Sequence, residues 1–160
     1  MEKKINTTLI FILVALSFSI IAAYTIEYGL GHEPCKLCIY QRIPYFFSIL
    51  LILNILLIKR YVKPSLLLLV LISLSGLILA FYHFGIEQGF FSEPFVCEAQ
   101  NLDNNLSKEE ILKKLKENTL SCKDVNFKVF GLSLASINAI FSFALFVIFV
   151  KLYKNYETNW

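Results

Sequence analysis

Long apolar runs, separated by short polar segments, dominate this chain of 160 residues. Four runs are long enough to cross a hydrocarbon layer of about 30 Å, which takes about 20 helical residues at ~1.5 Å each. These runs cover residues 5–26, 39–58, 65–84 and 129–150. Their apolar residues are continuous rather than alternating, which favours helices over the strands of a membrane barrel. The pattern therefore predicts an all-α integral membrane four-helix bundle, folded as a single domain over residues 1–160.

Composition favours a lipid over an aqueous surrounding. Hydrophobic residues make up 57% of the chain and charged residues 17%, whereas soluble domains carry about 25% charged residues. The net charge of +3 is spread over both membrane faces and forms no basic patch, so we expect the lipid bilayer, and no nucleic acid, as a partner. The first run follows Lys3 and Lys4 and is longer than the ~7–15 residue core of a signal peptide, which favours an uncleaved signal-anchor.

The distribution of cations predicts the orientation of the helices. Four spans place both termini on one side, together with the connection between the second and third runs. The cations of these segments are Lys3, Lys4, Lys59, Arg60, Lys63, Lys151 and Lys154, and cytoplasmic segments are enriched in such residues. The opposite loops are residues 27–38 and 85–128, of which the second balances six lysines with eight acidic residues. We therefore expect cytoplasmic termini and all four cysteines outside, where disulfides persist.

The long polar loop of residues 85–128 is a candidate functional segment, because long loops commonly carry function. Within it, Ser107 and Glu110 match a capping box and predict a short amphipathic helix that ends near residue 118. Its apolar face and its lysines suit either the headgroup plane or packing against the rest of the loop.

The strongest motif is Cys35-Lys36-Leu37-Cys38 at the mouth of the second run. Two thiols at this spacing can close a small, easily reduced ring. Helix-terminal amides favour a thiolate at Cys38, and the cation of Arg42, one turn further on, adds to this effect. The alternatives are a structural thiol pair or half of a zinc site, with Arg42 reaching the headgroups.

The second pair, Cys97 and Cys122, is 25 residues apart, which is too far for a zinc knuckle. That spacing suits a disulfide that closes the loop, which has either a structural or a redox role. Two separate pairs, one at the membrane surface and one in the loop, indicate a relay of electrons without a metal.

Three further polar residues and a group of aromatic residues surround this motif. His83 is the group of the third run that titrates near neutral pH, and an ionisable residue in a span is a functional candidate. Gln41 offers a further hydrogen-bond donor. The aromatic residues predicted to form an interfacial belt are Tyr24, Tyr28, Tyr40, Tyr45, Phe46 and Phe47. Arg42 and His83, at one depth beside an apolar slot, suit a carbonyl-bearing ring such as a quinone.

Residues 35–42, CKLCIYQR, resemble the C-x-x-C-x-x-Q-R signature of the DsbB family of disulfide bond formation proteins. Residues 82–91 and 122–135 are similar to the family's segments after the third span and before the fourth. The resemblance covers about residues 7–150 and includes the order of all four cysteines. Lys36 is a departure, because an apolar residue is expected between the two cysteines.

The resemblance implies a role for each site residue. Cys97, paired with Cys122, would be attacked by a reduced DsbA-like thiol oxidase of the periplasm. Cys35, paired with Cys38, would accept the electrons, and the Cys38 thiolate would face a quinone, either ubiquinone or menaquinone. The residues implied to hold the quinone are Arg42, with His83 and Gln41 nearby. The protein would then lie in a bacterial inner membrane.

Three other interpretations compete with this one. The vitamin K epoxide reductase type also has two cysteine pairs in a helical bundle, but in the reverse order along the chain. A paralogue that serves one dedicated DsbA-like partner would share every feature above. A zinc-stabilised scaffold without catalysis would instead bind about one metal ion per chain through four thiolates.

Overall fold

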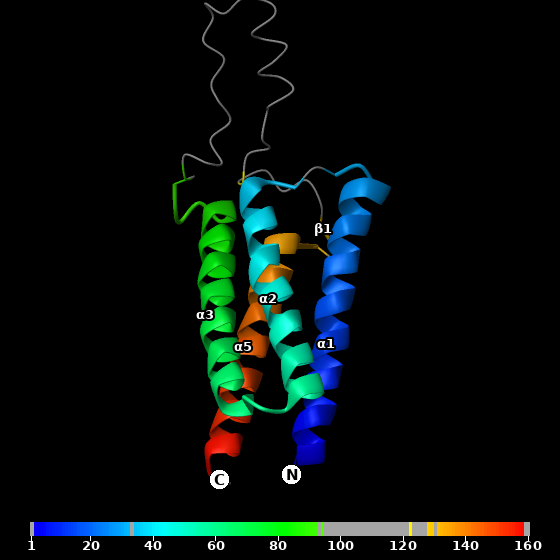
Figure 1. Ribbon diagram of the computed structural model, residues 1–160. Helices are drawn as coiled ribbons and strands as arrows, with labels where there is room; N and C mark the ends of the chain where they lie inside the picture. The colour runs from blue at the N-terminus through cyan, green and yellow to red at the C-terminus, as the bar shows by residue number, and fades with distance from the viewer. Residues whose placement is uncertain are drawn as a thin grey trace, which may run out of the picture.

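The computed structural model describes residues 2–32, 34–92, 94, 122, 128–129 and 131–158. Its long helices are α1 (Glu2–Tyr24), α2 (Lys36–Ile58), α3 (Val62–Glu87) and α5 (Leu134–Thr158). They form a bundle with both termini at one end (Figure 1). Each is long and apolar enough to cross a membrane. The predicted all-α, four-span membrane architecture is confirmed.

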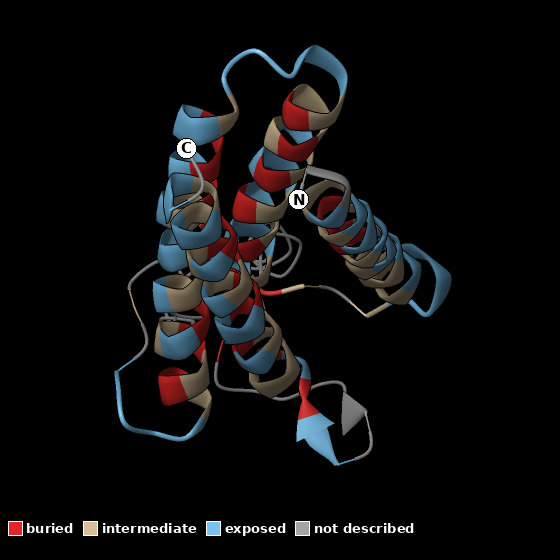
Figure 2. Ribbon diagram, turned by 90° about the horizontal axis from the view of Figure 1, so that it is seen from below, coloured by how far each residue is buried: buried red, intermediate tan, exposed pale blue. Residues whose placement is uncertain are grey.

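The helices pack in a defined order: α3 lies against both α5 and α2, and α1 lies against α2. Near the termini, a cluster of apolar side chains from all four helices is buried. Elsewhere, large apolar side chains such as Phe11 and Leu57 face outward, and Figure 2 shows such exposed faces on every long helix. An apolar exterior is expected of helices that contact lipid.

The first three helices extend beyond the predicted runs. A π-helical turn, η1 (Thr25–Gly29), continues α1, and α2 begins at Lys36, three residues before the predicted start. Lys59 ends α2 in the left-handed conformation (φ 55°). Because α3 begins at Val62, Pro64 lies within its first turn rather than in the connection before it. Proline is tolerated in a first turn because the amides there have no helical partner.

The fourth helix differs most from the prediction, which was wrong about its start. The predicted run begins at residue 129, whereas α5 begins at Leu134 and runs to Thr158. The preceding residues form an antiparallel hairpin of β1 (Lys128–Val129) and β2 (Leu132–Ser133), with Gly131 at φ 83° in its turn. The Ser133 hydroxyl then accepts the Ser136 N–H and caps the new helix. A short apolar run does not by itself distinguish a strand from a helix.

A close contact sets the distance between α2 and α3 below the cysteines. A Cβ added at Gly76 of α3 would lie 3.3 Å from the Pro44 Cβ of α2. Small residues at such positions let helix backbones approach closely in lipid. At the end of α3, the Phe91 ring folds back over Gly85, where an added Cβ would lie 2.3 Å from the ring. Both contacts flank the level of His83.

Two parts of the sequence-based prediction lie outside the described residues. These are the amphipathic helix at residues 107–118 and Cys97. Both remain predictions, as does the extent of the single domain.

Candidate redox site

The site is built on the first turn of α2, where both sulfurs of the Cys-x-x-Cys motif lie. Cys35 is the N-cap residue, and its Sγ accepts the backbone N–H of Cys38 at 3.3 Å. The two sulfurs are 2.9 Å apart, and both residues are free thiols. Cys35 is buried, at 7% exposed, whereas Cys38 is partly exposed. The pair therefore joins a buried residue to a partly exposed one.

The capping geometry corrects one part of the sequence argument. We expected the helix-terminal amides to favour a thiolate at Cys38, but the amide of Cys38 points at the Cys35 sulfur. The hydrogen bond with the Cys38 thiol, and then the hydrogen bond with His83, lower the pKa of the Cys35 thiol well below its usual range, although burial opposes them. Cys35 is thus the sulfur that this structure stabilises as an anion.

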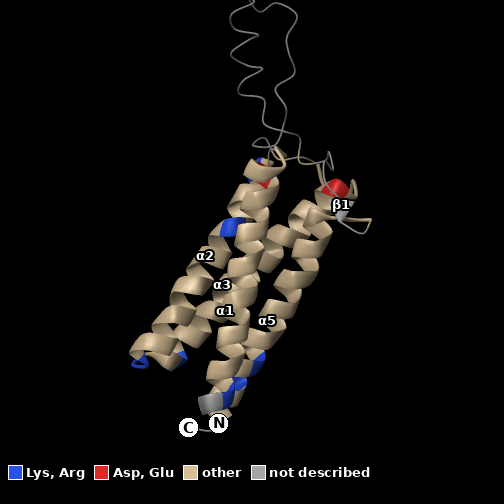
Figure 3. Cartoon of the chain, turned by 90° about the vertical axis from the view of Figure 1, so that its right-hand side faces the viewer, with Lys and Arg blue, Asp and Glu red and all other residues tan. Residues whose placement is uncertain are grey.

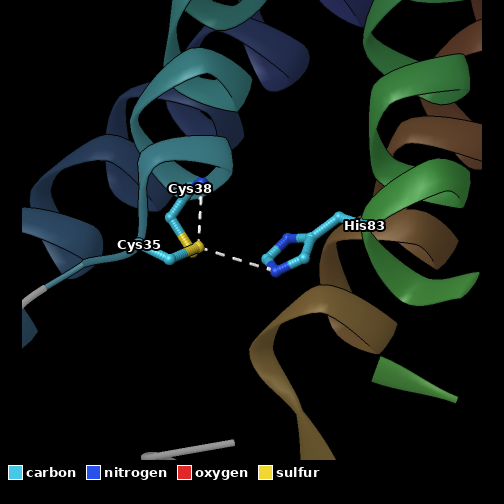
Figure 4. A group of neighbouring side chains, drawn as sticks. All are labelled: Cys35, Cys38 and His83. Atoms are coloured by element: carbon cyan, nitrogen blue, oxygen red, sulfur yellow. Dashed lines mark hydrogen bonds between the residues drawn. The ribbon is translucent and has the colours of Figure 1, made fainter. Parts of the chain in front are cut away.

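His83 reaches the pair from α3, and its ring points across the bundle toward the Cys35 sulfur (Figure 4). Nε2 lies 3.6 Å from Cys35 Sγ, and Nδ1 lies 3.2 Å from Gln41 Nε2. The side chain is only 3% exposed. His83 therefore lies within the protein and contacts a cysteine directly, rather than lying at the interface.

Gln41 is the centre of a hydrogen-bond network that the sequence did not predict. Its Nε2 also donates to the Leu79 carbonyl at 3.2 Å, and its Oε1 accepts from Asn138 Nδ2 at 2.8 Å. Asn138 Oδ1 in turn accepts the Tyr45 hydroxyl, which lies 3.3 Å from Ser142 Oγ. Tyr45 thus faces the bundle interior, and its assignment to the interfacial aromatic belt was wrong.

Arg42 occupies a different face of α2 from Gln41. Its Nη1 donates to Glu27 Oε2 at 2.6 Å, in an ion pair whose side chains are 13% and 19% exposed. Its guanidinium carbon also lies 4.7 Å from the centre of the Tyr24 ring. The described contacts of Arg42 are therefore with the end of α1 and η1, whereas those of His83 are with Gln41 and Cys35.

Cys122 lies beside the first pair. It is disulfide-bonded and 2% exposed, and it belongs to the same buried cluster as Cys35, Leu37 and Ile86. A disulfide-bonded Cys122 offers no thiolate for a metal, which disfavours the four-cysteine zinc site considered above. Cys35, Cys38 and His83 do bring three potential metal ligands within 4.8 Å of one another, whereas structural zinc sites almost always use four.

Four residues were not placed in the site on the basis of the sequence: Tyr45, Asn138, Ser142 and Glu27. The spacing of polar residues along the helices could have identified the first three. Gln41 and Tyr45 are one helical turn apart, as are Asn138 and Ser142, and such pairs share a helix face. Polar residues within a span face the bundle interior, so this spacing could have identified Tyr45, Asn138 and Ser142. No comparable pattern connects Arg42 with the fourth, Glu27, which lies 15 residues earlier.

The arrangement defines a class of protein. A pair of thiols at the mouth of a membrane helix, a histidine nitrogen at the buried sulfur, and a disulfide sulfur in the same cluster are the parts of a membrane thiol–disulfide oxidoreductase.

Comparisons with known proteins identify the family within this class. The family model for disulfide bond formation protein DsbB matches residues 5–152, so the chain belongs to the DsbB family. It is also similar to an uncharacterized protein, RP370, of Rickettsia prowazekii (strain Madrid E), with 31% identity over 140 residues that cover 84% of this chain and 81% of the relative.

Membership in the family determines the type of reaction. Members of the DsbB family are disulfide-generating oxidoreductases, and this chain is therefore an enzyme of that type. The family typically uses a quinone as its electron acceptor and a DsbA-like protein as its partner.

Proposed function

We propose that this enzyme reoxidises a periplasmic DsbA-like thiol oxidase and transfers the electrons to a membrane quinone, either ubiquinone or menaquinone. The observation that carries the proposal is the burial of the Cys122 disulfide sulfur in one cluster with Cys35. Exchange between two disulfides requires direct attack by one sulfur on another. A disulfide-bonded cysteine in the same buried cluster as Cys35 supports a relay, whereas a purely structural loop disulfide has no need to lie there.

The first steps of the proposed relay are two thiol–disulfide exchanges. A thiolate of the partner attacks Cys97 of the Cys97–Cys122 disulfide, forms a mixed disulfide and releases the Cys122 thiolate. Cys122 then attacks Cys35 of the Cys35–Cys38 disulfide, and the bond between Cys35 and Cys38 breaks, so that Cys38 leaves as a thiolate. Each step forms one S–S bond and breaks one.

Two further exchanges return the loop pair to its starting state. The second thiol of the partner attacks the mixed disulfide, so that the partner leaves oxidised and Cys97 is freed. Cys97 attacks Cys122 in the Cys35–Cys122 disulfide, which restores the loop disulfide and frees Cys35. Two electrons and two protons have then moved from the partner to the pair of Cys35 and Cys38.

The residues around Cys38 fit a lipid-soluble ring as the final acceptor. When bound, a quinone supplies a two-electron acceptor that also takes up two protons. Cys38 is the partly exposed residue of the pair, and Arg42 follows one turn later with guanidinium donors beyond the one used by Glu27. The neighbouring side chains Ile39 and Ile43 are 44% and 47% exposed, which leaves an apolar path from the lipid. Arg42 would bind a carbonyl oxygen of the ring.

The proposed orientation places both termini in the cytoplasm and the cysteines in the periplasm of a bacterial inner membrane. Lysine and arginine gather at the end of the bundle that carries both termini (Figure 3). At the opposite end, the described cations are Lys36, Arg42 and Lys128, of which Arg42 is paired with Glu27. The positive-inside rule therefore supports this orientation. A membrane-impermeant thiol reagent should label reduced protein in intact spheroplasts; labelling that requires lysis of the membrane would contradict it.

The proposed activity can be tested with purified protein in nanodiscs. Reduced DsbA-like protein and a quinone are added, and quinone reduction is followed by its absorbance. Wild-type protein should turn over continuously, whereas Cys38→Ala should stop after oxidising about one partner per molecule, because its loop disulfide can be used only once. Cys97→Ala should be reduced by a small dithiol but not by the partner. Equal rates of quinone reduction by wild type and Cys38→Ala would exclude the proposal.

A dedicated partner remains a separate question, which the same assay addresses. Oxidases from unrelated bacteria can replace the native partner at equal concentration. Comparable kcat/KM values for several of them indicate a general enzyme, and activity with a single one indicates a dedicated paralogue.

A further inference from the structure

A directed series of hydrogen bonds joins α5 to the buried sulfur of the redox pair. Each of the three contributing helices presents two polar groups one turn apart, and on α3 one of them is the backbone carbonyl of Leu79. The members are Tyr45 and Gln41 of α2, Asn138 and Ser142 of α5, and Leu79 and His83 of α3. The series runs from the Tyr45 hydroxyl through Asn138 and Gln41 to His83, and ends at Cys35. Among the described residues, every buried side-chain nitrogen or oxygen has a partner.

The direction of the series is set by a backbone carbonyl. The Leu79 carbonyl, 3.2 Å from the Gln41 amide group, can only accept, so the Gln41 nitrogen must face it. That nitrogen carries a second hydrogen, which it donates to His83 Nδ1 at 3.2 Å. Nδ1 is therefore the unprotonated nitrogen of the neutral ring. The proton lies on Nε2, which is 3.6 Å from Cys35 Sγ and donates to it.

Asn138 prevents the opposite arrangement. Its Nδ2 donates to Gln41 Oε1 at 2.8 Å, so that this oxygen is occupied and cannot turn toward His83. Its own Oδ1 faces the Tyr45 hydroxyl, which can donate to it, and this contact keeps the Asn138 nitrogen directed at Gln41. Without Asn138, Gln41 could present its oxygen to a proton on Nδ1, and Nε2 would then face the Cys35 sulfur with a lone pair. Two lone pairs in contact would disfavour a thiolate.

We infer that Asn138 is a positioning residue of the redox reaction, which acts through Gln41 to hold His83 with Nε2–H directed at the Cys35 sulfur. The inference rests on the proposed function for its redox meaning. It gives Gln41 a role different from quinone binding, because all three polar hydrogen-bonding contacts of its side chain are made with the protein. It also explains why an asparagine and a tyrosine hydroxyl are retained inside an apolar bundle, where unpaired polar groups are costly.

The titratable and charged groups around the series come from three elements. They are Cys38, Arg42 and Tyr45 of α2, Tyr82 and Glu87 of α3, and Glu27 of η1. Glu27 is paired with Arg42, and Glu87 accepts the Ser133 hydroxyl. Helix α5 contributes Asn138 and Ser142, which do not titrate, and Cys122 is held in a disulfide. Among the described residues, the titratable groups in direct contact with the Cys35 sulfur are therefore His83 and the Cys38 thiol.

The histidine ring itself provides the first readout. The chain has two histidines, so His32→Gln protein labelled with 15N-histidine reports on His83 alone. Nitrogen chemical shifts distinguish the two neutral tautomers. The reduced parent protein should show the tautomer protonated at Nε2. Asn138→Leu, which has a similar size but no polar atoms, should shift the population toward protonation at Nδ1.

The second readout is the pH dependence of Cys35 alkylation in reduced protein, with each cysteine resolved by mass spectrometry. Asn138→Leu should move the midpoint for Cys35 upward by about one pH unit, a roughly tenfold loss of thiolate at a given pH below the midpoint. Tyr45→Phe keeps the ring that packs edge-on against Phe141 and should shift both readouts less, in the same direction. Asn54→Leu, the same change at a half-buried position in the last two turns of α2, is the matched control and should leave both unchanged.

These measurements separate the inference from the proposed function, because neither partner nor quinone is present. A parent protein protonated at Nδ1 overturns the inference. So does a pair of variants, Asn138→Leu and Tyr45→Phe, that both match the parent in tautomer and in alkylation midpoint. If Asn138→Leu does not fold, Tyr45→Phe alone decides. An enzyme with the Nε2–H tautomer that never reduces quinone overturns the proposed function and leaves the positioning role of Asn138 supported.

Discussion

The half of the bundle near the termini and the half near the cysteines are packed by different interactions, although both are built from α1, α2, α3 and α5. The terminal half is dry and apolar. Its buried cluster consists of Leu9, Ile12, Leu16, Ile52, Ile55, Leu66, Leu69, Leu145, Phe149 and Leu152. The cysteine half has a smaller cluster, formed around Cys35 and Cys122, and beside it the hydrogen-bond series that ends at His83.

The difference indicates that the terminal half mainly stabilises the bundle, whereas the cysteine half carries the redox chemistry. In lipid, apolar packing gains no hydrophobic free energy over contact with acyl chains, and it stabilises through close van der Waals contact. Such contact tolerates no unpaired charge, which excludes redox chemistry from the terminal half. The cysteine half instead surrounds its reactive sulfurs with oriented donors, so that a thiolate can form there without leaving a charge unpartnered.

The largest expected effect is a loss of stability without a loss of activity, caused by removing apolar packing from the terminal half alone. Phe149 of α5 is completely buried in the terminal cluster. Phe149→Ala leaves a cavity there, and we expect it to lower the free energy of unfolding by about 3 kcal/mol. Turnover per folded molecule should be unchanged, because the reactive sulfurs lie in the other half. Thermal unfolding in detergent and quinone reduction well below the transition measure the two quantities.

Phe143→Ala is the matched control on the same helix. Its ring is 55% exposed to the lipid side, so its loss should cost less than about 0.5 kcal/mol. A parallel fall of stability and turnover in Phe149→Ala would show that the two halves are not independent.

The second prediction tests the ion pair at the edge of the cysteine half. Glu27→Gln removes the carboxylate that holds the Arg42 guanidinium, so we expect the KM for quinone to rise about tenfold, with kcat at saturation close to wild type. Arg42→Gln, which removes the guanidinium itself, should raise KM ten- to a hundredfold. The measurement is steady-state quinone reduction in nanodiscs.

Glu157→Gln is the control for this prediction, because it breaks an exposed ion pair with Lys63 (3.3 Å) at the terminal end. Exposed pairs contribute little, and KM should not change. An Arg42→Gln protein with the KM of wild type would show that Arg42 only anchors the helix in the membrane.

The smallest expected effect concerns pH and redox state. Because the folded-state pKa of Cys35 is lowered, its contribution to the stability of the reduced protein is complete above the unfolded pKa of ~8.5 and is lost as pH falls through the folded value. Reduced protein should therefore lose stability relative to oxidised protein on acidification from about pH 8.5. Oxidised protein, in which Cys35 does not titrate, is the control, and parallel pH profiles of the two forms would contradict the stabilised thiolate.

The architecture could be predicted because a hydrocarbon layer restricts it so strongly. Runs of apolar residues of sufficient length must be helices, and short connections make them antiparallel neighbours. The motif at Cys35 and Cys38 was equally clear, because its chemistry depends on spacing along the chain. Both features are local in the sequence.

The contacts between helices could not be predicted in the same way. In a soluble helix the apolar stripe marks the buried face, but these helices are apolar all round, so the rotation of each helix is not apparent from the pattern. Tyr45 was therefore assigned to the interface, although its hydroxyl contacts Asn138 and Ser142 of α5. Glu27 could be connected with Arg42 only once the chain had folded.

The burial of Cys122 beside Cys35 has a kinetic consequence. Two disulfides that had to meet by diffusion of a free loop would exchange at a rate set by how often the loop returned. A sulfur buried in the same cluster as its target has an effective molarity far above that of a freely diffusing loop. The internal exchange is then a first-order step that does not depend on how much enzyme the membrane contains. In the relay proposed above, the encounter with the soluble partner would then be the slow step, so turnover should scale with the concentration of that partner.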